Sequence, residues 1–176
     1  TVEGDTGTRV ESDEDRRLRE LREREDGRSD ERRTRSDASA AVDAGTADLI
    51  SRGLKYGIPQ SVVDDQIEDV GMVLHAWNTG KPLFILANEA GTGKTFVLGG
   101  AIRELRRAGA KRFIYVTMNQ DLIEQIKRDL ADFGVGDVEF STYSDLSTKG
   151  QVYSDGGVVI FDEAHNVKNA LAARAS

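Results

Sequence analysis

The residues with the clearest chemical role form a glycine-rich segment, Asn88-Glu89-Ala90-Gly91-Thr92-Gly93-Lys94-Thr95. Gly91 and Gly93 allow a tight turn whose backbone N–H groups can point at phosphate oxygens, and a following helix N-terminus adds the positive end of its dipole. Lys94 can then reach the β- and γ-phosphates, and Thr95 has the type and position of a hydroxyl ligand to Mg²⁺. The segment predicts a Walker A phosphate loop that binds ATP with Mg²⁺. Asn88 replaces the first glycine of the strict pattern, and a glycine-rich turn without a ligand is the alternative.

Two adjacent carboxylates follow an apolar stretch further along the chain. Residues 158–161 predict a buried strand, and Asp162 and Glu163 come directly after it. Ligands of open α/β sheets bind at the carboxyl ends of the strands. Asp162 would hold Mg²⁺ there through water, and Glu163 could orient and deprotonate an attacking water. A helix N-terminus with favourable charge is the alternative for this pair.

Strands and helices are expected to alternate between these two segments. Continuous apolar runs predict strands, and apolar residues at three- and four-residue steps predict helices. Strands are expected at 83–87, 112–117, 138–141 and 158–161, and helices at 95–108 and 121–133. Such alternation is typical of a mostly parallel sheet with helices on both faces. The predicted fold class is therefore α/β.

Composition divides the chain near residue 45. Residues 1–45 hold 14 Asp and Glu, ten Arg and no aromatic side chain. This is too little apolar surface to offset the entropy of folding, so we expect a charged linker that is disordered or partly helical. An arm that docks a partner protein is the alternative. Residues 46–80 are expected to form a leading helical segment, and residues 81–176 an incomplete phosphate-binding lobe.

Composition also excludes several classes of protein. The chain has no Cys, which excludes disulfides, thiolate metal sites and a cysteine nucleophile. Its longest apolar runs are far shorter than the roughly 20 residues of a membrane-spanning helix, and the N-terminal residues show no signal-peptide pattern. A net charge of −7 argues against coating of nucleic acid by the whole surface and leaves a local binding track. We expect a cytoplasmic protein with no membrane partner.

The two chemical segments resemble motifs I and II of superfamily 2 helicases and translocases, with motif II as Asp162-Glu163-Ala164-His165. The phosphate loop and residues 162–169 are similar to Swi/Snf-type DNA translocases, while residues 115–134 and 159–163 look like the strawberry notch helicase-like family. The resemblance covers about residues 60–176. It implies the first RecA-like lobe of a bacterial or phage-encoded enzyme. A second RecA-like lobe would complete the site, so the chain alone is expected not to turn over ATP.

The resemblance also implies roles for side chains outside the two motifs. Gln66 resembles a glutamine that reads the adenine base, with a solvent-facing helix residue as the alternative. Thr117 and Asn119 follow the second strand, where such enzymes contact a nucleic-acid backbone. Thr142 and Tyr143 resemble a second backbone-contacting element. Ordinary turn and capping chemistry is the alternative for all four residues.

Three classes of function remain open. The first is an ATP-dependent helicase or translocase on nucleic acid, preferably double-stranded DNA, in which Lys94 and Glu163 are catalytic. In that class the resemblance implies that His165 couples the nucleotide site to the second lobe. The second class is a P-loop ATPase that acts on protein, and the third is a non-catalytic docking module. The intact set of Lys94, Thr95, Asp162 and Glu163 argues against the third class.

Overall fold

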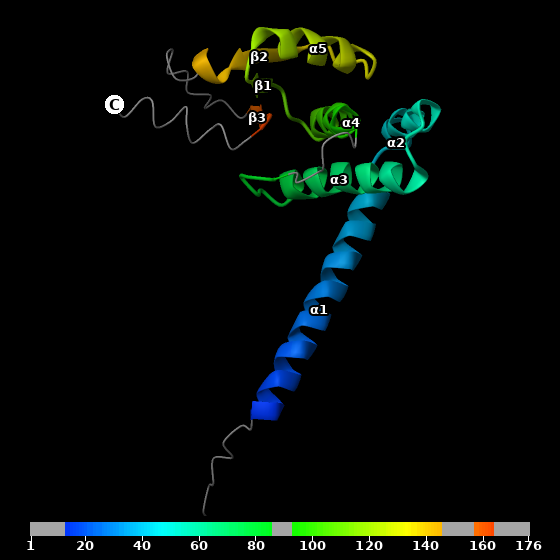
Figure 1. The fold of residues 1–176 in the computed structure, drawn as a ribbon, viewed down its shortest axis with the longest axis vertical. Coiled ribbons are helices and arrows are strands. Elements are labelled where there is room, and N and C mark those ends of the chain that lie inside the picture. Colours follow the sequence, from blue (N-terminus) through cyan, green and yellow to red (C-terminus); the bar gives the residue numbers. More distant parts are fainter. Residues whose placement is uncertain (1–12, 86–92, 146–156, 164–176) are drawn as a thin grey trace, which may run out of the picture. The chain divides into compact units, whose positions relative to one another are not determined.

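The computed structural model describes residues 13–85, 93–145 and 157–163 (Figure 1). The chain divides into two units between Asp37 and Ala38. This boundary falls inside a helix and lies before the composition change at residue 45. The predicted division into a linker, a leading segment and a lobe stays a prediction.

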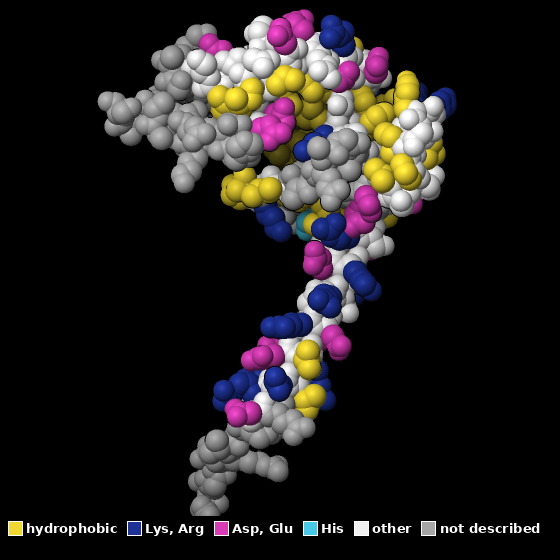
Figure 2. All heavy atoms as spheres, viewed as in Figure 1, with side chains coloured by type: hydrophobic (Ala, Val, Ile, Leu, Met, Phe, Trp, Pro, Cys, Tyr) yellow, Lys and Arg dark blue, Asp and Glu magenta, His cyan; other side chains and the backbone are white. Residues whose placement is uncertain are grey.

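The described part of the first unit belongs to helix α1 (Asp13–Ala40). Leu18 and Leu21, its larger apolar residues, are 48% and 54% exposed, so this part of the helix has no buried apolar face. Ion pairs one turn apart join Arg19 to Glu23 at 3.8 Å and Glu31 to Arg35 at 3.5 Å. Figure 2 shows acidic and basic side chains interleaved along this helix. Local charge pairing, and not core packing, therefore supports its helical conformation.

Helices also make up the first half of the second unit. Their bounds are α2 (Ala44–Ser51), the 3₁₀ helix η1 (Arg52–Tyr56), α3 (Gln60–Asn78) and α4 (Lys94–Arg107). The side chain of Asp43 accepts from the N–H of Gly45 and so caps α2, while Pro59 precedes α3. The predicted helix at 95–108 is confirmed by α4. Within the described residues no helix is long and apolar enough to cross a membrane.

The second half contains a three-stranded parallel sheet in the order β2-β1-β3. Its elements are β1 (Phe113–Thr117), α5 (Gln120–Ala131), β2 (Val138–Thr142) and β3 (Val158–Phe161). All five residues of β1 are buried, as expected for a central strand with neighbours on both edges. These elements confirm the predicted α/β fold class, and the small parallel sheet with its helices matches part of a RecA-like lobe.

The two faces of the sheet carry different clusters, because side chains alternate along β1. Phe113 belongs to the larger cluster, which includes Ile102 of α4 and Leu130 of α5. Ile114 and Val116 point the other way and pack with Tyr143 and the half-buried Val159. Among the described residues, α4 and α5 therefore pack on the Phe113 face.

The prediction of a strand at 83–87 is wrong for its first three residues. Leu83 and Ile85 are irregular and 71% and 72% exposed, and Phe84 is 37% exposed. Residues 86 and 87 lie outside the described structure. An apolar run becomes a strand only where a neighbouring edge accepts its backbone hydrogen bonds. Among the described residues, no strand pairs with this segment.

Candidate functional site

The described end of the phosphate loop is the start of α4. Gly93 precedes the helix with φ 72° and ψ 42°, a left-handed conformation that favours glycine. Its carbonyl oxygen accepts from the N–H of Phe96 at 2.9 Å. Lys94 is exposed and Thr95 half-buried, and among the described residues no side-chain cap is found at this end of the helix. The helix N-terminus therefore combines a lysine, a hydroxyl and uncapped backbone N–H groups, which suits an anion.

Gln66 of α3 lies against this turn. Its side chain is fully buried, and Nε2 donates a hydrogen bond of 3.5 Å to the carbonyl oxygen of Gly93. A Cβ atom at position 93 would lie 2.7 Å from the same nitrogen. The solvent-facing alternative for Gln66 is therefore wrong, because packing of α3 on α4 encloses the side chain. Its contact with an adenine base stays a prediction.

The two carboxylates lie at the carboxyl end of β3. The N–H of Asp162 donates to the carbonyl oxygen of Val116 at 3.0 Å, which continues the sheet pairing by one residue. Thr117, the last residue of β1, donates from Oγ1 to Oδ2 of Asp162 at 3.3 Å. Asp162 is half-buried and Glu163 is exposed. The parallel register of β1 and β3 thus holds the first carboxylate and leaves the second open to solvent.

Two tyrosines complete the surroundings of Asp162. Burial raises the pKa of Tyr115, and the charge of Asp162 and a side-chain hydrogen bond to it raise that pKa further. Burial also raises the pKa of Tyr143, again with contributions from the charges of Asp162 and Glu163. Both hydroxyls therefore keep their protons at neutral pH and serve as hydrogen-bond donors. Sequence reasoning missed Tyr115 altogether, although its place two residues before the end of a buried strand was visible.

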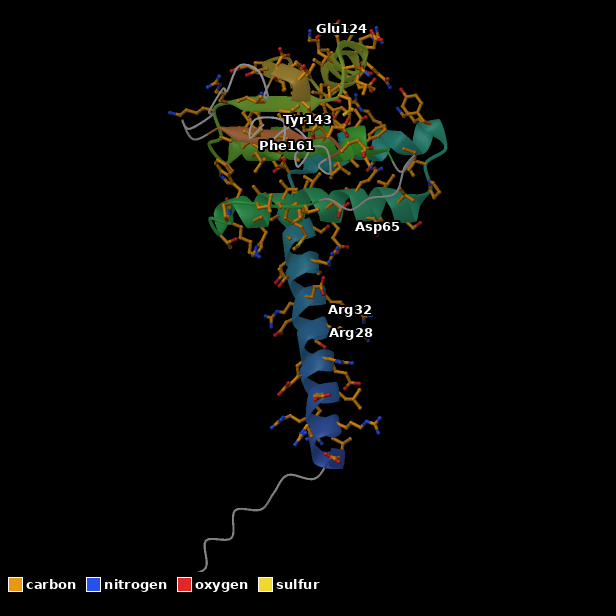
Figure 3. The ribbon with its side chains drawn as sticks, turned by 60° about the vertical axis from the view of Figure 1, so that its left-hand side comes forward. Arg28, Arg32, Asp65, Glu124, Tyr143 and Phe161 are labelled. Atoms are coloured by element: carbon orange, nitrogen blue, oxygen red, sulfur yellow. The ribbon has the colours of Figure 1, made fainter. Side chains whose placement is uncertain are left out.

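Tyr143 contacts the main chain of the carboxylate turn. Its hydroxyl donates to the carbonyl oxygen of Asp162 at 2.6 Å and lies 3.4 Å from that of Glu163. Its ring stacks on Phe161, with centroids 6.3 Å apart (Figure 3). Glu163 has φ 55°, a left-handed conformation. The family resemblance implied that Tyr143 contacts nucleic acid, whereas the residue is 7% exposed and its side chain is engaged in this turn.

The other three residues predicted to contact nucleic acid also have internal partners. Thr117 is fully buried and bonded to Asp162. The side chain of Asn119 is exposed and accepts from the N–H of Leu122 at 3.1 Å, which caps α5. The alternative of turn and capping chemistry therefore describes Asn119 in this structure, and burial turns Thr117 away from the surface.

Thr142 forms a reciprocal cap with Asp145. Its hydroxyl donates to Oδ2 of Asp145 at 2.9 Å and accepts from the N–H of Asp145 at 3.1 Å. The N–H of Thr142 donates to the same carboxylate at 3.4 Å. This is a capping box, and the spacing Thr-x-x-Asp was its signal in the sequence. The Thr142 hydroxyl therefore fixes the end of β2.

The side chains available as metal ligands suit a Mg²⁺ ion better than a metal ion that is bound by protein ligands alone. In the part of the chain that the structure describes, no three His, Asp or Glu side chains form a metal-binding group. Mg²⁺ keeps several waters and is held by one or two carboxylates together with substrate phosphates. Asp162 and the Thr95 hydroxyl are ligands of that kind. That both groups bind the same ion stays a prediction, since each of them is positioned by a different set of contacts.

The remaining predicted site residues lie outside the described structure. They are Glu89, Ala90, Gly91 and Thr92 of the phosphate loop, and His165 after the carboxylates. The described residues form two groups. Gln66 and Gly93 meet at the start of α4, and Asp162 is surrounded by side chains from the ends of β1 and β2.

Comparison with known families identifies the domain. The family model "Type III restriction enzyme, res subunit" matches residues 60–155, more than half of the chain. The chain therefore belongs to this family and carries a superfamily 2 helicase-like domain. No curated protein and no solved structure shows a significant match. The matched range ends before Asp162, so the roles of the two carboxylates depend on the geometry described above.

Proposed function

We propose that this member of the type III restriction enzyme res subunit family is the nucleotide-binding half-site of an ATP-dependent helicase or translocase. The observation that carries the proposal is Asp162 at the carboxyl end of β3, where the hydroxyl of Thr117 holds its carboxylate. Carboxyl ends of parallel strands are where ligands of α/β sheets bind. A glycine-led helix start with Lys94 and Thr95 supplies the complementary phosphate site.

Different residues would bind different parts of the nucleotide. Backbone N–H groups from Glu89 to Thr95 would bind the phosphates, and Lys94 would reach the β- and γ-phosphates. Thr95 and Asp162 would hold Mg²⁺. When bound, Mg²⁺ neutralises charge on the phosphate oxygens. Gln66 would contact the adenine base or support the phosphate loop through Gly93.

Glu163 would act on the attacking water. Its side chain is exposed, in contrast to the half-buried Asp162, so water has access to it. A carboxylate in this position can orient a water molecule and accept its proton. His165 would connect this turn to the second RecA-like lobe. Arginines from that lobe would stabilise transition-state charge, which contributes about 10³–10⁵ in rate.

We place the nucleic-acid contacts at the ends of β1 and β2, where main-chain groups of the protein would make most of them. The hydroxyls of Thr117, Thr142 and Tyr143 have internal partners. Asn119 and Ser144 lie beside them with exposed side chains and would carry the side-chain part of the contact. Contacts to a phosphate backbone position a duplex and carry little sequence information. Double-stranded DNA is the substrate that the resemblance to Swi/Snf-type and strawberry notch proteins favours, for a bacterial or phage-encoded enzyme that acts in the cytoplasm.

Two other classes give different experimental results. A P-loop ATPase that acts on protein would hydrolyse ATP without stimulation by DNA. A docking module would not bind nucleotide. Membership in a helicase-like family supports the first proposal over both.

Calorimetric titration of Mg-ADP into the protein tests the nucleotide site. We expect weak binding by the unchanged chain and loss of binding in Lys94→Ala, because the charge that faces the phosphates is removed. Lys81→Ala, at an exposed lysine outside the loop, is the matched control and should bind like the parent. Equal binding by the parent and Lys94→Ala would contradict the phosphate site. In the full-length protein, ATPase activity should depend on DNA length and salt far more than on base sequence.

A further inference from the structure

Tyr143 joins the end of β2 to the turn that carries the two carboxylates. Its hydroxyl donates a hydrogen bond of 2.6 Å to the carbonyl oxygen of Asp162 and lies 3.4 Å from the carbonyl oxygen of Glu163. Its ring stacks on Phe161 at an interplanar angle of 21°. The side chain of the residue that follows β2 thus contacts three consecutive residues, the last of β3 and the two after it.

The turn has a conformation that needs such support. Among the described residues, Glu163 is the one non-glycine residue with positive φ, at 55°. A left-handed conformation is strained for an L-residue, and it persists where surrounding contacts hold it. The N–H of Asp162 is held by the carbonyl oxygen of Val116 at 3.0 Å. The hydroxyl of Tyr143 donates to the carbonyl oxygen of Asp162 and lies 3.4 Å from that of Glu163, so the turn is held both from β1 and from the residue after β2.

The position of Tyr143 is itself fixed. The capping box of Thr142 and Asp145 determines the backbone on either side of it, and its side chain is 7% exposed. Its ring packs with Ile114 and Val116 in the smaller core cluster. A buried ring with an engaged hydroxyl cannot reach out to a nucleic-acid backbone without leaving this cluster. The geometry favours an internal role.

We propose that Tyr143 is a positioning residue for Glu163. Its hydroxyl fixes the main chain of the Asp162–Glu163 turn and thereby holds the Glu163 carboxylate in the place from which it acts on water. The inference rests on the proposed function, because it takes Glu163 as the general base. It replaces the expectation that the Tyr143 side chain contacts nucleic acid.

Tyr143→Phe tests the proposal, because it removes the hydroxyl and keeps the ring in the core. Tyr56→Phe is the matched control, since Tyr56 is 79% exposed on η1. The first measurement is the NMR resonance of the Asp162 carbonyl carbon, after labelling of Asp carbonyl carbons and Glu amide nitrogens. Its signal is identified by its disappearance in Asp162→Asn. The amide resonances of Glu104 in α4 and Glu139 in β2, which carry the same nitrogen label, report whether the second unit of the variant is folded.

The second measurement is the steady-state ATPase activity of the full-length protein at varied ATP and varied DNA. We expect Tyr143→Phe to shift the Asp162 carbonyl resonance and to lower kcat by about 10- to 100-fold, as misplacement of a reacting group does. The KM for ATP and the DNA concentration for half-maximal stimulation should change by less than about twofold, because neither ligand is bound by this hydroxyl. Tyr56→Phe should match the parent in all measurements.

Three results would overturn the proposal. An unchanged carbonyl resonance means that the hydroxyl does not hold the turn. A shifted resonance with unchanged kcat means that the turn does not position Glu163. A raised DNA requirement with full kcat at saturating DNA assigns the side chain to nucleic-acid binding instead. Absence of nucleotide binding in the unchanged protein is a distinct failure, which contradicts the proposed function and removes the positioning role with it.

Discussion

The hydroxyl of Thr117 donates a hydrogen bond to Oδ2 of Asp162 at 3.3 Å and so links the last residue of β1 to the first residue after β3. Thr117 is fully buried, and the parallel pairing of the two strands determines how far apart the two residues lie. A donor of this kind orients a carboxylate without binding the ligand itself. Such outer partners are worth about 10- to 100-fold in metal affinity or activity.

Thr117→Val should therefore weaken the response to Mg²⁺. We expect the Mg²⁺ concentration for half-maximal nucleotide binding to rise by about tenfold, because the Asp162 carboxylate loses the group that orients it. Calorimetry with ADP at varied Mg²⁺ measures this. Thr117→Ser keeps the hydroxyl and should behave like the parent. If valine and serine give the same Mg²⁺ dependence, the bond between Thr117 and Asp162 has no part in metal binding.

Glu163→Gln should abolish ATP turnover in the full-length protein and preserve nucleotide binding. The amide cannot accept the proton of water, whereas Asp162 and its contacts remain in place. Phosphate release measures turnover, and calorimetry measures nucleotide affinity. Glu124→Gln, on the exposed face of α5 beside Lys127, is the matched control. Unchanged ATPase activity in Glu163→Gln would exclude Glu163 as the base.

Gly93→Ala should lower the free energy of unfolding more than Gly57→Ala. Both glycines have left-handed φ, 72° and 81°, and each alanine costs about 1–2 kcal/mol for that reason. At position 93 the new Cβ would also lie 2.7 Å from Nε2 of Gln66, whereas position 57 has open space. Urea unfolding of both variants measures the difference. Equal losses, or no relief when Gln66→Ala is combined with Gly93→Ala, would contradict the packing of α3 on the phosphate loop.

Thr46→Val should destabilise the protein by about 1–3 kcal/mol, because a buried carboxylate loses its close donor and keeps the more distant ion pair with Arg107 at 3.9 Å. Thr46 of α2 is fully buried and donates to Oε1 of Glu104 of α4 at 2.5 Å. Thr46→Ser preserves the hydroxyl and should cost less. Chemical denaturation measures both. A valine variant as stable as the serine variant would show that the bond between α2 and α4 contributes little.

Asp43 should make folding stability depend on acid pH. Arg107 on α4 pairs with Asp43 at 2.5 Å, and this hydrogen bond lowers the pKa of Asp43 below 3.8. Because the pKa of Asp43 is lower in the folded state, the ionised carboxylate stabilises the folded protein at pH values above 3.8. This stabilisation is lost as the pH falls through the pKa of Asp43 in the folded state. Asp43→Asn keeps the cap on α2 and removes the titration.

The matching measurement is urea unfolding of the parent and Asp43→Asn from neutral pH to well below 3.8. The stability of the parent should fall more steeply than that of Asp43→Asn at the acid end. If the free energies of unfolding of the two proteins depend on pH in the same way, Arg107 does not pair with Asp43 in solution.

Local sequence determined the elements and the identity of the chemical groups. Apolar periodicity located α4, α5 and the three strands of the sheet, because burial of one face imposes that spacing. The residues at the start of α4 and the end of β3 were identified for a different reason, since phosphate and Mg²⁺ chemistry requires few residue types. The strand at 83–87 failed in its described part, because a strand also needs a neighbouring edge.

Only the tertiary structure decided what the hydroxyl and amide groups bind. Thr117, Thr142 and Tyr143 have side chains that could contact a phosphate or a protein group equally well. The pairing of β1 with β2 and β3 brings Thr117 and Tyr143 to Asp162, which lies 45 and 19 residues away in the chain. Gln66 is similar, because its burial depends on how α3 packs on α4. Sequence sets which bonds a side chain can form, and the partner depends on contacts between residues far apart in the chain.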